Sequence, residues 1–510
     1  MRRHPGKWKV LRVIVSGLAL LWIGALFLDI HNRIPEAWYL PLRYFQIVPA
    51  MQLMLAAGGG ALLAFSILML SAALFGRYYC SFLCPLGAMQ DIMGFFRRKW
   101  THRKRYKMMP LNRGWRYGSL LLFVFLILIG SGAAIGLMDP YSHAGRIVSQ
   151  LAVNPAILFN NIIAWMLESQ RMYAVPPVPA ARFQVAPFLL ATTLFALLWV
   201  LVWRNGRIYC NTFCPVGAGL GILASRSLFR IRFDQEACTA CGLCAADCKA
   251  GCIDFRQKTI DASRCVMCMN CLTSCKEGGI RYTLGRKQRT RAFSGERRQV
   301  MKMLGIAPVL PLAAPLSAPG PGERSCAISP PGSGSHAHLH RLCTACQLCV
   351  QACPSHVLQP SFLAYGLKGA FQPVLDPDAG YCNFDCVRCT EVCPTGALQP
   401  VTIDEKHRLQ LGKAKFLFDY CVVTQEYKNC GACSEHCPTK AVNMVPWKGK
   451  LYIPEVNESL CVGCGACEHA CPTDPLSIYV EGQEVHGLAD LPESRKEEQV
   501  ETPVLEEFPF

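Results

Sequence analysis

The chain has 510 residues, of which 52% are hydrophobic and 17% charged, and it holds 30 cysteines. This composition is too apolar for a disordered protein or an ordinary soluble one, and the length excludes a small disulfide-stapled secreted domain. The net charge of +17 divides into +26 for residues 1–318 and −9 for residues 319–510. Two environments are therefore expected, rather than a uniform binder of nucleic acid.

Four apolar runs in the first half are long enough to span a bilayer, which takes about 20 residues. They lie near Val10–Leu28, Ala50–Phe75, Tyr117–Leu137 and Ala186–Trp203. Basic residues gather at the N-terminus, in loop 76–116 and after Trp203, which predicts that both ends of this region are cytoplasmic. We therefore expect an α-helical membrane domain of four spans over residues 1–230, with the lipid bilayer as a partner. No run contains histidine and no Cys-x-x-Cys-His motif occurs, so haem is not expected.

An internal repeat lies within this predicted membrane domain. The segment GRYYCSFLCPLGA at 76–88 matches GRIYCNTFCPVGA at 206–218, and each follows an apolar run. One interpretation makes Cys80, Cys84, Cys210 and Cys214 small packing residues or a structural disulfide. The other brings four thiolates together on one further metal or iron–sulfur centre. The duplication of the whole Cys-x-x-x-Cys-Pro pattern favours the second.

Two ferredoxin motifs follow in a predicted cytoplasmic domain over residues 231–285. Both have the bacterial spacing Cys-x2-Cys-x2-Cys-x3-Cys, in which the fourth cysteine binds the other cluster. We expect one 4Fe–4S cluster on Cys238, Cys241, Cys244 and Cys275, and a second on Cys265, Cys268, Cys271 and Cys248. Lys249 and Lys276 replace the usual proline after the fourth cysteine, and a nearby positive charge is expected to favour the reduced cluster.

Four further sets recur at intervals of 39 or 40 residues over residues 341–480, and each ends in Cys-Pro. They are Cys343, Cys346, Cys349 and Cys353; Cys382, Cys386, Cys389 and Cys393; Cys421, Cys430, Cys433 and Cys437; and Cys461, Cys464, Cys467 and Cys471. This array predicts four more clusters, six in all, in α+β ferredoxin-like domains. The fourth cysteines are exchanged either between neighbouring sets or between first and fourth and between second and third.

Zinc is the alternative cofactor for such cysteines. Structural zinc takes four ligands from two Cys-x-x-Cys knuckles, which six consecutive sets of four do not resemble. Cys252 and Cys326 remain outside all sets and are expected to be structural or free thiols.

The junction at 286–340 has a basic part, an apolar part at 303–318 and a Pro/Gly/Ser-rich linker from 321. Its order, with RRQVMK at 297–302, resembles a twin-arginine export signal; a cytoplasmic hinge or a fifth helix is the alternative. Export would place the acidic array in the periplasm. His336, His338 and His340 are expected to be incidental linker residues rather than metal ligands. The tail 481–510 carries nine acidic residues and is expected to be mobile.

The paired Gly-Arg-x-Tyr-Cys-x3-Cys-Pro repeat, followed by two ferredoxin motifs, resembles the NapH-type membrane iron–sulfur proteins, a group that includes NosR and CcoG. The array with its Cys421-x8-Cys430 spacing is similar to the NapG/MauM ferredoxins. Over about residues 1–480 the chain looks like a fusion of the two, without NosR's flavin-binding domain. The resemblance implies a multi-pass protein of the bacterial inner membrane that oxidises a quinol and delivers electrons to a periplasmic reductase.

The expected function is therefore electron transfer from quinol through 4Fe–4S clusters to a redox partner protein. If the chain is an enzyme, it is a quinol-dependent oxidoreductase. Its catalytic residues stay unknown, because Asp139, Tyr141 and His143 are only weak candidates for a quinol site. The alternatives are a redox factor that assembles a respiratory metalloenzyme, and a cytoplasmic electron carrier or redox sensor.

Overall fold

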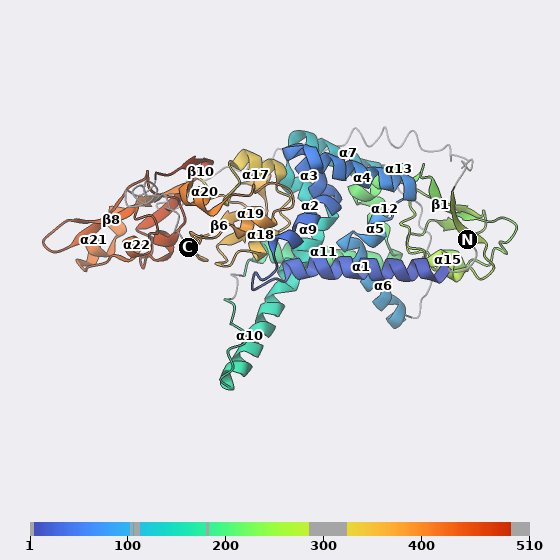
Figure 1. The fold of residues 1–510 in the computed structure, drawn as a ribbon, viewed down its shortest axis with the longest axis horizontal. Coiled ribbons are helices and arrows are strands. Elements are labelled where there is room, and N and C mark those ends of the chain that lie inside the picture. The colour runs from blue at the N-terminus through green and yellow to red at the C-terminus, as the bar shows by residue number, and fades with distance from the viewer. Residues whose placement is uncertain (1–4, 102–105, 107–112, 180–182, 285–323, 491–510) are drawn as a thin grey trace, which may run out of the picture. The chain divides into compact units, whose positions relative to one another are not determined.

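The computed structural model describes residues 5–101, 106, 113–179, 183–284 and 324–490 (Figure 1). The chain divides into two compact units. The first contains residues 1–313, 340–351 and 394–396, and the second contains residues 314–339, 352–393 and 397–510. The predicted array domain is therefore split between the units. The predicted basic and apolar junction at 286–323 lies outside the described residues.

Helices make up most of the first unit. They are α1 (Pro5–Phe27), α2 (Leu40–Phe45), α3 (Ile47–Ala57), α4 (Gly59–Phe75), α5 (Tyr79–Phe82), α6 (Pro85–Thr101), α7 (Arg113–Ile129), α8 (Gly132–Gly136), α9 (Pro140–Leu151), α10 (Val153–Ser169), α11 (Val185–Asn205), α12 (Ile208–Thr212) and α13 (Pro215–Ala224). Proline begins α6, α9 and α13, at a helical position that has no intrahelical partner for an N–H group.

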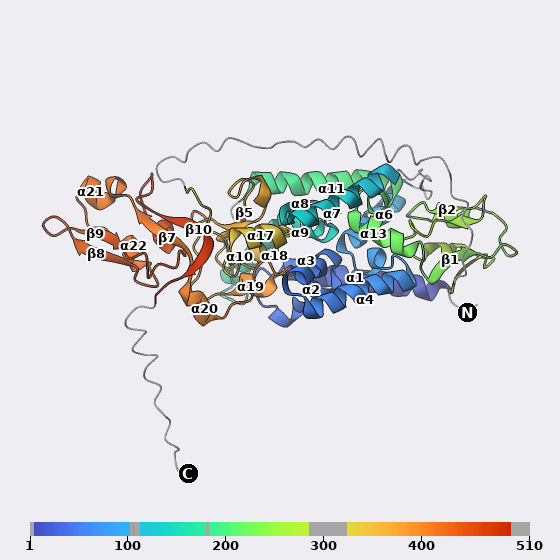
Figure 2. The same cartoon turned by 90° about the horizontal axis from the view of Figure 1, so that it is seen from above.

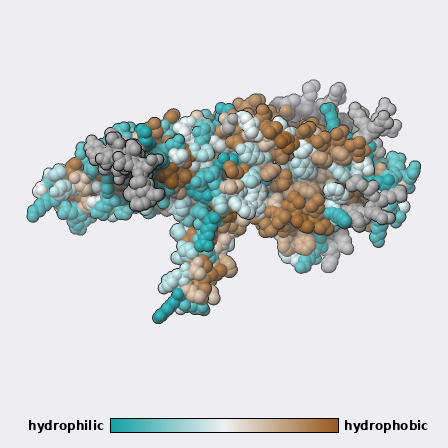
Figure 3. Space-filling view, in the orientation of Figure 1, coloured by the Kyte–Doolittle hydropathy of each residue, from teal (hydrophilic) through white to brown (hydrophobic). Residues whose placement is uncertain are grey.

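Within the described residues, three stretches of helix are long and apolar enough to cross a membrane: Gly6–Phe27, Pro140–Ser169 and Val185–Asn205. Large apolar side chains remain exposed on these and neighbouring helices, among them Leu21, Leu63 and Leu128 at 70, 64 and 80%. Figure 3 shows apolar side chains gathered over this helical region. Such a surface is expected to face lipid or a partner, because soluble monomers rarely expose it.

Two of the four predicted spans, Val10–Leu28 and Ala186–Trp203, coincide with α1 and α11. The other two are interrupted by glycines with positive φ. Gly58 (φ 61°) separates α3 from α4, and Gly130 (φ 75°) ends α7 before α8. The helices α9 and α10, which together form the apolar stretch Pro140–Ser169, do not correspond to any predicted span. Figure 1 shows α10 projecting away from the other helices of this unit.

Residues 229–284 fold as a small ferredoxin-like domain within the first unit. Strand β1 (Phe229–Phe233) pairs antiparallel with β4 (Ile280–Leu284), and β2 (Ile253–Asp254) pairs with β3 (Thr259–Ile260). The short helices α14 (Leu243–Ala246) and α15 (Asn270–Ser274) carry cysteines. One continuous hydrophobic core joins this domain to the helices, through residues such as Leu68, Leu198 and Val266.

The described residues of the second unit form three two-stranded antiparallel sheets. They pair β5 (Leu358–Pro360) with β6 (Pro373–Leu375), β7 (Leu409–Phe416) with β10 (Ile478–Leu488), and β8 (Val442–Pro446) with β9 (Tyr452–Val456). The outer pair β7–β10 and the inner pair β8–β9 repeat the arrangement of β1–β4 and β2–β3. The helices include α19 (Arg388–Val392), α20 (Ile403–Arg408), α21 (Val422–Glu426), α22 (Ala432–Glu435) and α23 (Ala466–His469). Figure 2 shows this unit from above.

Two segments are packed more tightly than predicted. The described part of the predicted linker, from residue 324, is packed: Ser329 and Ser333 are buried and hydrogen-bond to His486. A Cβ on Gly332 would lie 2.3 Å from the carbonyl oxygen of Gln399, so glycine serves close packing here. The predicted tail begins as strand, since residues 481–488 belong to β10. Residues 491–510 lie outside the described residues.

Candidate metal centres

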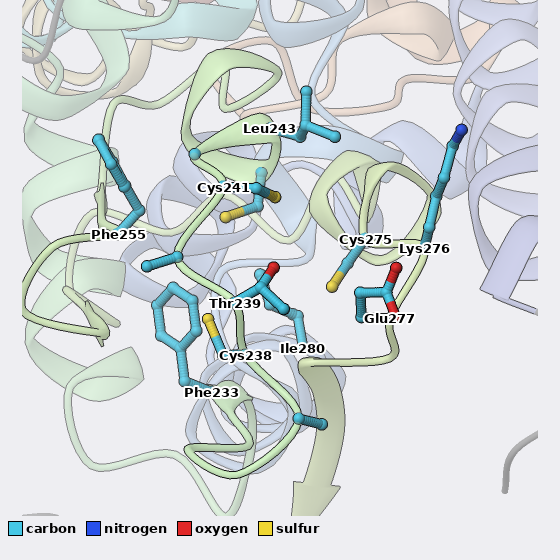
Figure 4. A pocket seen from close by; sticks show the side chains of 14 residues that line it. Phe233, Cys238, Thr239, Cys241, Leu243, Phe255, Cys275, Lys276, Glu277 and Ile280 are labelled. Atoms are coloured by element: carbon cyan, nitrogen blue, oxygen red, sulfur yellow. The ribbon is translucent and has the colours of Figure 1, made fainter.

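Site 1 is a pocket of about 160 Å³ lined by Cys238, Cys241, Cys244 and Cys275. Figure 4 shows the sulfur atoms of Cys238, Cys241 and Cys275 turned toward a common space. The structure thus brings together the four cysteines that the ferredoxin spacing groups. Phe233, Phe255 and Ile280 complete an apolar wall.

Site 2 gathers Cys248, Cys265, Cys268 and Cys271. A fifth thiol, Cys252, lines the same pocket, with its Sγ 3.5 Å from that of Cys248. The thiol and the backbone N–H of Cys252 approach Cys248, and these bonds lower the pKa of Cys248 to about 7. Cys252 therefore belongs to the surroundings of the site, whereas Cys326 lies in the other unit, where its N–H donates to Glu481.

Cys343, Cys346 and Cys349 of the first array motif lie on one loop, which we call site 3, and Cys343 and Cys346 lie within electrostatic range of Arg146. Their loop lies in the first unit and ends in α18 (Leu348–Gln351). The guanidinium of Arg146, on α9, donates to the carbonyl oxygens of Thr344 at 2.9 Å and Ala345 at 3.0 Å. A Cβ on Gly136 would lie 1.9 Å from Thr344 O, which explains a glycine where α8 meets this loop.

The other array cysteines assemble in the second unit by exchange between neighbouring sets. Site 4 is lined by Cys353, Cys382, Cys386 and Cys389. Site 5 is lined by Cys421, Cys430, Cys433 and Cys471. Site 6 is formed by Cys437, Cys461, Cys464 and Cys467, which lie within electrostatic range of one another. The arrangement of first with fourth and second with third is not observed. Cys393 lies in the second unit, where Leu398 N–H donates to its Sγ at 3.4 Å.

The loops that carry these cysteines share an unusual backbone. In the four motifs with the spacing Cys-x2-Cys-x2-Cys, the residues before and after the second cysteine both have positive φ. They are Ala240 and Gly242, Met267 and Met269, Ala345 and Gln347, and Gly463 and Gly465. Left-handed backbone costs a non-glycine residue roughly 1–2 kcal/mol, so it persists only where the surroundings require it. A loop wound in this way turns its N–H groups and thiols toward one centre, as a cubane cluster needs.

Zinc and a cubane cluster need different thiol spacings. A zinc site needs four sulfurs within about 2.3 Å of one atom, whereas in an Fe–S core each sulfur binds a different iron. Among the described residues, no three His, Cys, Asp or Glu side chains converge closely enough to hold a single metal ion.

Burial makes these thiols poor candidates for isolated thiolates. Desolvation raises the pKa of Cys382 to about 11, and that of Cys433 and Cys464 to about 12. Thiolates at these positions therefore require a metal centre, whose binding would release protons. When bound, 4Fe–4S clusters would supply one-electron carriers at sites 1 to 6.

The four cysteines of the internal repeat meet in a four-thiol site. Cys80 lies in α5 and Cys84 follows that helix, while Cys210 lies in α12 and Cys214 follows it. All four are 5–6% exposed. Cys214 lies within electrostatic range of the other three. The four thiols are thus brought together, as the second interpretation of the repeat requires.

The two repeats hold each other through their arginines. Arg77 of the first donates to the carbonyl oxygen of Cys210 at 2.8 Å and to Asn211 Oδ1 at 2.7 Å. Arg207 of the second donates to the carbonyl oxygens of Cys80 at 2.5 Å and Gly87 at 2.8 Å. Sequence reasoning did not assign these residues a role, although the repeated Gly-Arg dipeptide was the available signal.

Glycines allow the two cysteine repeats to pack closely. A Cβ on Gly87 would lie 2.2 Å from the carbonyl oxygen of Cys80, and one on Gly217 would lie 2.1 Å from that of Cys210. Real Cβ atoms do not approach backbone oxygens so closely, so the Gly-Ala pair that closes each repeat serves the packing of the four-thiol site.

The two lysines that replace proline differ in their surroundings. Lys276 is exposed, and Figure 4 shows its amine directed away from the thiols of site 1, so it does not support the expected effect on that site. Lys249 is buried and its Nζ lies 3.0 Å from Asp91, which also pairs with Arg207 and Arg12. Lys249 is near Cys268 of site 2, but Asp91 offsets its charge.

The weak quinol candidates lie on α9. Asp139 caps this helix, accepting from the N–H groups of Tyr141 and Ser142, which accounts for its burial. His143 packs edge-on against Tyr209, the neighbour of Cys210, with ring centroids 6.2 Å apart. His336, on α17 (His336–Leu342), bonds to Ala327 O at 3.0 Å, so it is part of a packed segment rather than a linker.

Comparison with protein families finds matches in the repeat region and in the array. A family described as "4Fe-4S binding domain" matches residues 57–103 and 185–233, which contain the two repeats. Families described as "4Fe-4S dicluster domain" match residues 342–398 and 428–474. That one family matches both helical segments supports their interpretation as repeats. No solved structure matches the chain.

Curated relatives are ferredoxin-type and electron-transport proteins. The chain is 27% identical to the putative electron transport protein YccM of Escherichia coli over 43% of this chain and 53% of YccM. It is 28% identical to the ferredoxin-type protein NapH of Haemophilus influenzae over 36% of this chain and 50% of NapH. It is 28% identical to the methylamine utilization ferredoxin-type protein MauM of Methylobacillus flagellatus over 32% of this chain and 73% of MauM.

The matched segments thus span about half of YccM and NapH. They confirm the resemblance to NapH-type and MauM-type ferredoxin-type proteins, and the chain shares 4Fe–4S-binding domains with known families. The apolar helices and the NapH relative indicate a membrane protein.

Proposed function

We propose that the chain carries electrons across a bacterial inner membrane, from a quinol to a redox partner in the periplasm, through 4Fe–4S clusters at sites 1 to 6. The observation that carries this proposal is that one helix, α1, contacts both α15 of site 2 and α18 of site 3. Figure 1 shows these two helices near opposite ends of α1.

The length of α1 matches a membrane. Its 23 residues span about 35 Å, and the hydrocarbon core of a bilayer is about 30 Å thick. Arg12, toward its N-terminus, pairs with Asp91 in the network that holds Lys249. Phe27, at its C-terminus, flanks Gly145 together with the carbonyl of Cys346. This geometry supports cytoplasmic sites 1 and 2 and a periplasmic site 3, the arrangement that an export signal between them would also produce.

The four-thiol site has contacts toward both sides. Ser81, next to Cys80, donates to the carbonyl oxygen of Val266 in the site 2 loop at 2.6 Å. Tyr209, next to Cys210, contacts His143, and Arg146 one turn further along α9 holds the site 3 loop. These contacts support the four-thiol site as the redox centre between sites 2 and 3, with quinol oxidised in the same helical region.

The test uses Cys80→Ala and Cys210→Ala, with Cys326→Ala as the matched control outside all seven sites. Protein purified without oxygen is mixed with a reduced quinol, and cluster bleaching is followed. Both repeat variants should lose quinol-dependent reduction and keep reduction by dithionite, whereas the control keeps both. Unchanged quinol turnover in the repeat variants would contradict the proposal. A reporter fused after Phe510 that is active only in the cytoplasm would refute the periplasmic placement.

A further inference from the structure

The sites of the second unit do not follow the order of their motifs in the sequence. The N–H of Cys382, in site 4, donates to the carbonyl oxygen of Cys464, in site 6, at 2.9 Å. Site 5 shares the β7–β10 domain with site 6. Figures 1 and 2 both show α21, which follows Cys421, at the end of this unit farthest from α19 of site 4. The spatial order is therefore site 4, site 6, site 5.

An insertion distinguishes site 5 from the other sites. Its first two cysteines, Cys421 and Cys430, are separated by eight residues, where the other motifs have two or three. The extra residues form α21 and end in Tyr427, whose left-handed backbone (φ 55°) turns the chain back toward Cys430. The insertion thus adds a protrusion next to the last site.

Three aromatic side chains meet at this protrusion. Tyr427 stacks on Trp447, from the turn between β8 and β9, with ring centroids 6.1 Å apart. Phe418 meets the same Trp447 edge-on at 5.6 Å. Tyr427 and Phe418 are nevertheless 62 and 44% exposed. Exposed aromatic rings that already support one another are typical of recognition surfaces, because little entropy is lost when they are covered.

The turn that carries Trp447 is positively charged, although Asp419 follows Phe418 and Glu426, which pairs with Lys428, precedes Tyr427. Lys448 lies over the Trp447 ring, with its Nζ 4.6 Å from the centroid, and Lys450 is exposed in the same turn. Residues 436–454 contain three lysines and no acidic residue, although residues 319–510 carry a net charge of −9. A cationic patch on an acidic half of a chain is complementary to an acidic partner.

We propose that Phe418, Tyr427, Trp447, Lys448 and Lys450 form a docking patch for an acidic one-electron carrier protein, which takes electrons from site 5. This inference rests on the proposed function, because it assumes that site 5 is a loaded cluster. Tyr427 is three residues from Cys430, so a partner seated on the patch lies beside the last cluster of the line. One electron leaves the reduced cluster at site 5 and reduces the oxidised centre of the carrier.

The test compares two probes with the same haem and opposite surface charge: native cytochrome c, which is basic, and succinylated cytochrome c, which is acidic. Full-length protein is reduced with dithionite, desalted and mixed with each probe, and haem reduction is followed by stopped flow. At low ionic strength the acidic probe should react at least about tenfold faster, and the difference should vanish near 0.5 M salt.

Charge reversal at the patch supplies the decisive variant. K448E/K450E should slow the acidic probe by at least about tenfold and speed the basic one, while Tyr427→Ser should slow the acidic probe at every salt concentration. The matched control K368E, an exposed lysine elsewhere in this unit, should change neither rate by more than about twofold. A faster basic probe with the unaltered protein, or equal rates in K448E/K450E, would overturn the proposal.

Two further outcomes distinguish a docking patch from a self-association surface and from an unloaded site 5. If K448E/K450E changes the oligomeric state and not the rates, the patch is an interface between copies of the chain, and the proposal is wrong. A small dye acceptor, dichlorophenolindophenol, needs no docking patch. Failure of the reduced protein to bleach this dye would overturn the proposed function itself, whereas dye bleaching without discrimination between the probes would overturn only the patch.

Discussion

Asp91 should be the residue on which the junction between the membrane helices and the ferredoxin-like domain most depends. Its carboxylate lies 2.8 Å from Arg207 and 3.0 Å from Lys249, and it also pairs with Arg12. Its side chain is 13% exposed and those of its partners are 2–7% exposed. Asp91→Asn would leave three buried cations with no negative charge among them.

The expected cost follows from this burial. Removing one partner of a buried ion pair typically costs about 3–5 kcal/mol, because the remaining charge stays desolvated. Asparagine keeps one acceptor oxygen, so we expect the lower end, about 3 kcal/mol. For domains of 150–250 residues each kcal/mol shifts Tm by roughly 2–4 °C, which predicts a fall of about 6–12 °C.

The stabilisation contributed by Asp91 should depend on pH in one direction. Burial alone would raise the pKa of Asp91, but the charges of Arg207, Lys249 and Arg12 lower it below its usual value. Stabilisation by a carboxylate with a lowered pKa is fully present above its unfolded pKa of about 3.9, and is lost as the pH falls below that value. At pH 7 the whole difference between the two proteins should therefore be measurable.

The assay is thermal unfolding of the detergent-solubilised protein at pH 7. Asp234→Asn is the matched control, because Asp234 pairs with Arg281 at 2.7 Å where the side chains are 25 and 45% exposed. Such exposed pairs contribute about 0–1 kcal/mol, so the control should shift Tm by less than about 4 °C. Equal shifts in the two variants would refute the reasoning that the buried cations make Asp91 necessary.

Three other predictions concern separate parts of the chain. Gly217→Ala should lower Tm by several degrees, because its Cβ would lie 2.1 Å from the carbonyl oxygen of Cys210. The control Gly219→Ala should leave Tm unchanged, because the nearest atom to its Cβ is 3.8 Å away. Equal Tm shifts in the two variants would contradict the packing argument. Arg146→Gln removes the hydrogen bonds to Thr344 and Ala345 and should change the EPR signal of one cluster only. A change in the signals of all clusters would show that the arginine does not act on site 3 alone. Burial, together with the charge of His336, lowers the pKa of His486 to about 4. The stability of the second unit should therefore fall as the pH drops from 6.5 toward 4. In unfolding curves measured over this pH range, His486→Gln should make the stability less dependent on pH.

The grouping of cysteines at sites 1 and 2 was predictable because the spacing of two or three residues constrains which thiols reach one pocket. The array was not predictable to the same degree, because four nearly equal intervals allow more than one exchange of fourth cysteines. The structure selects neighbouring sets, with Cys353 beside Cys382 and Cys471 beside Cys421.

The membrane helices show a different limit. Hydropathy predicts α1 and α11 well, since these are uninterrupted apolar helices. It does not detect the breaks at Gly58 and Gly130, because glycine is common within transmembrane helices and only its backbone angle ends the helix. Hydropathy does not predict helix α9 as part of a span, because buried polar residues such as Arg146 lower the mean hydropathy of the segment.

The contacts between repeats and the ordered linker depend on tertiary structure. Arg77 and Arg207 each bond to the opposite repeat, more than 100 residues away, which no local pattern encodes. The segment from residue 324 has the composition of a linker, but serine and glycine also permit close packing, as Ser329 and Gly332 do here.

The most direct test of the proposed electron-transfer chain is an iron and acid-labile sulfide count on protein purified without oxygen, with zinc measured in the same sample. Six clusters predict about 24 iron atoms and 24 sulfides per chain, with any centre at the four-thiol site adding to this number. A colourless protein, or one in which zinc replaces iron and sulfide is absent, would contradict the claim that these cysteines hold cubane clusters.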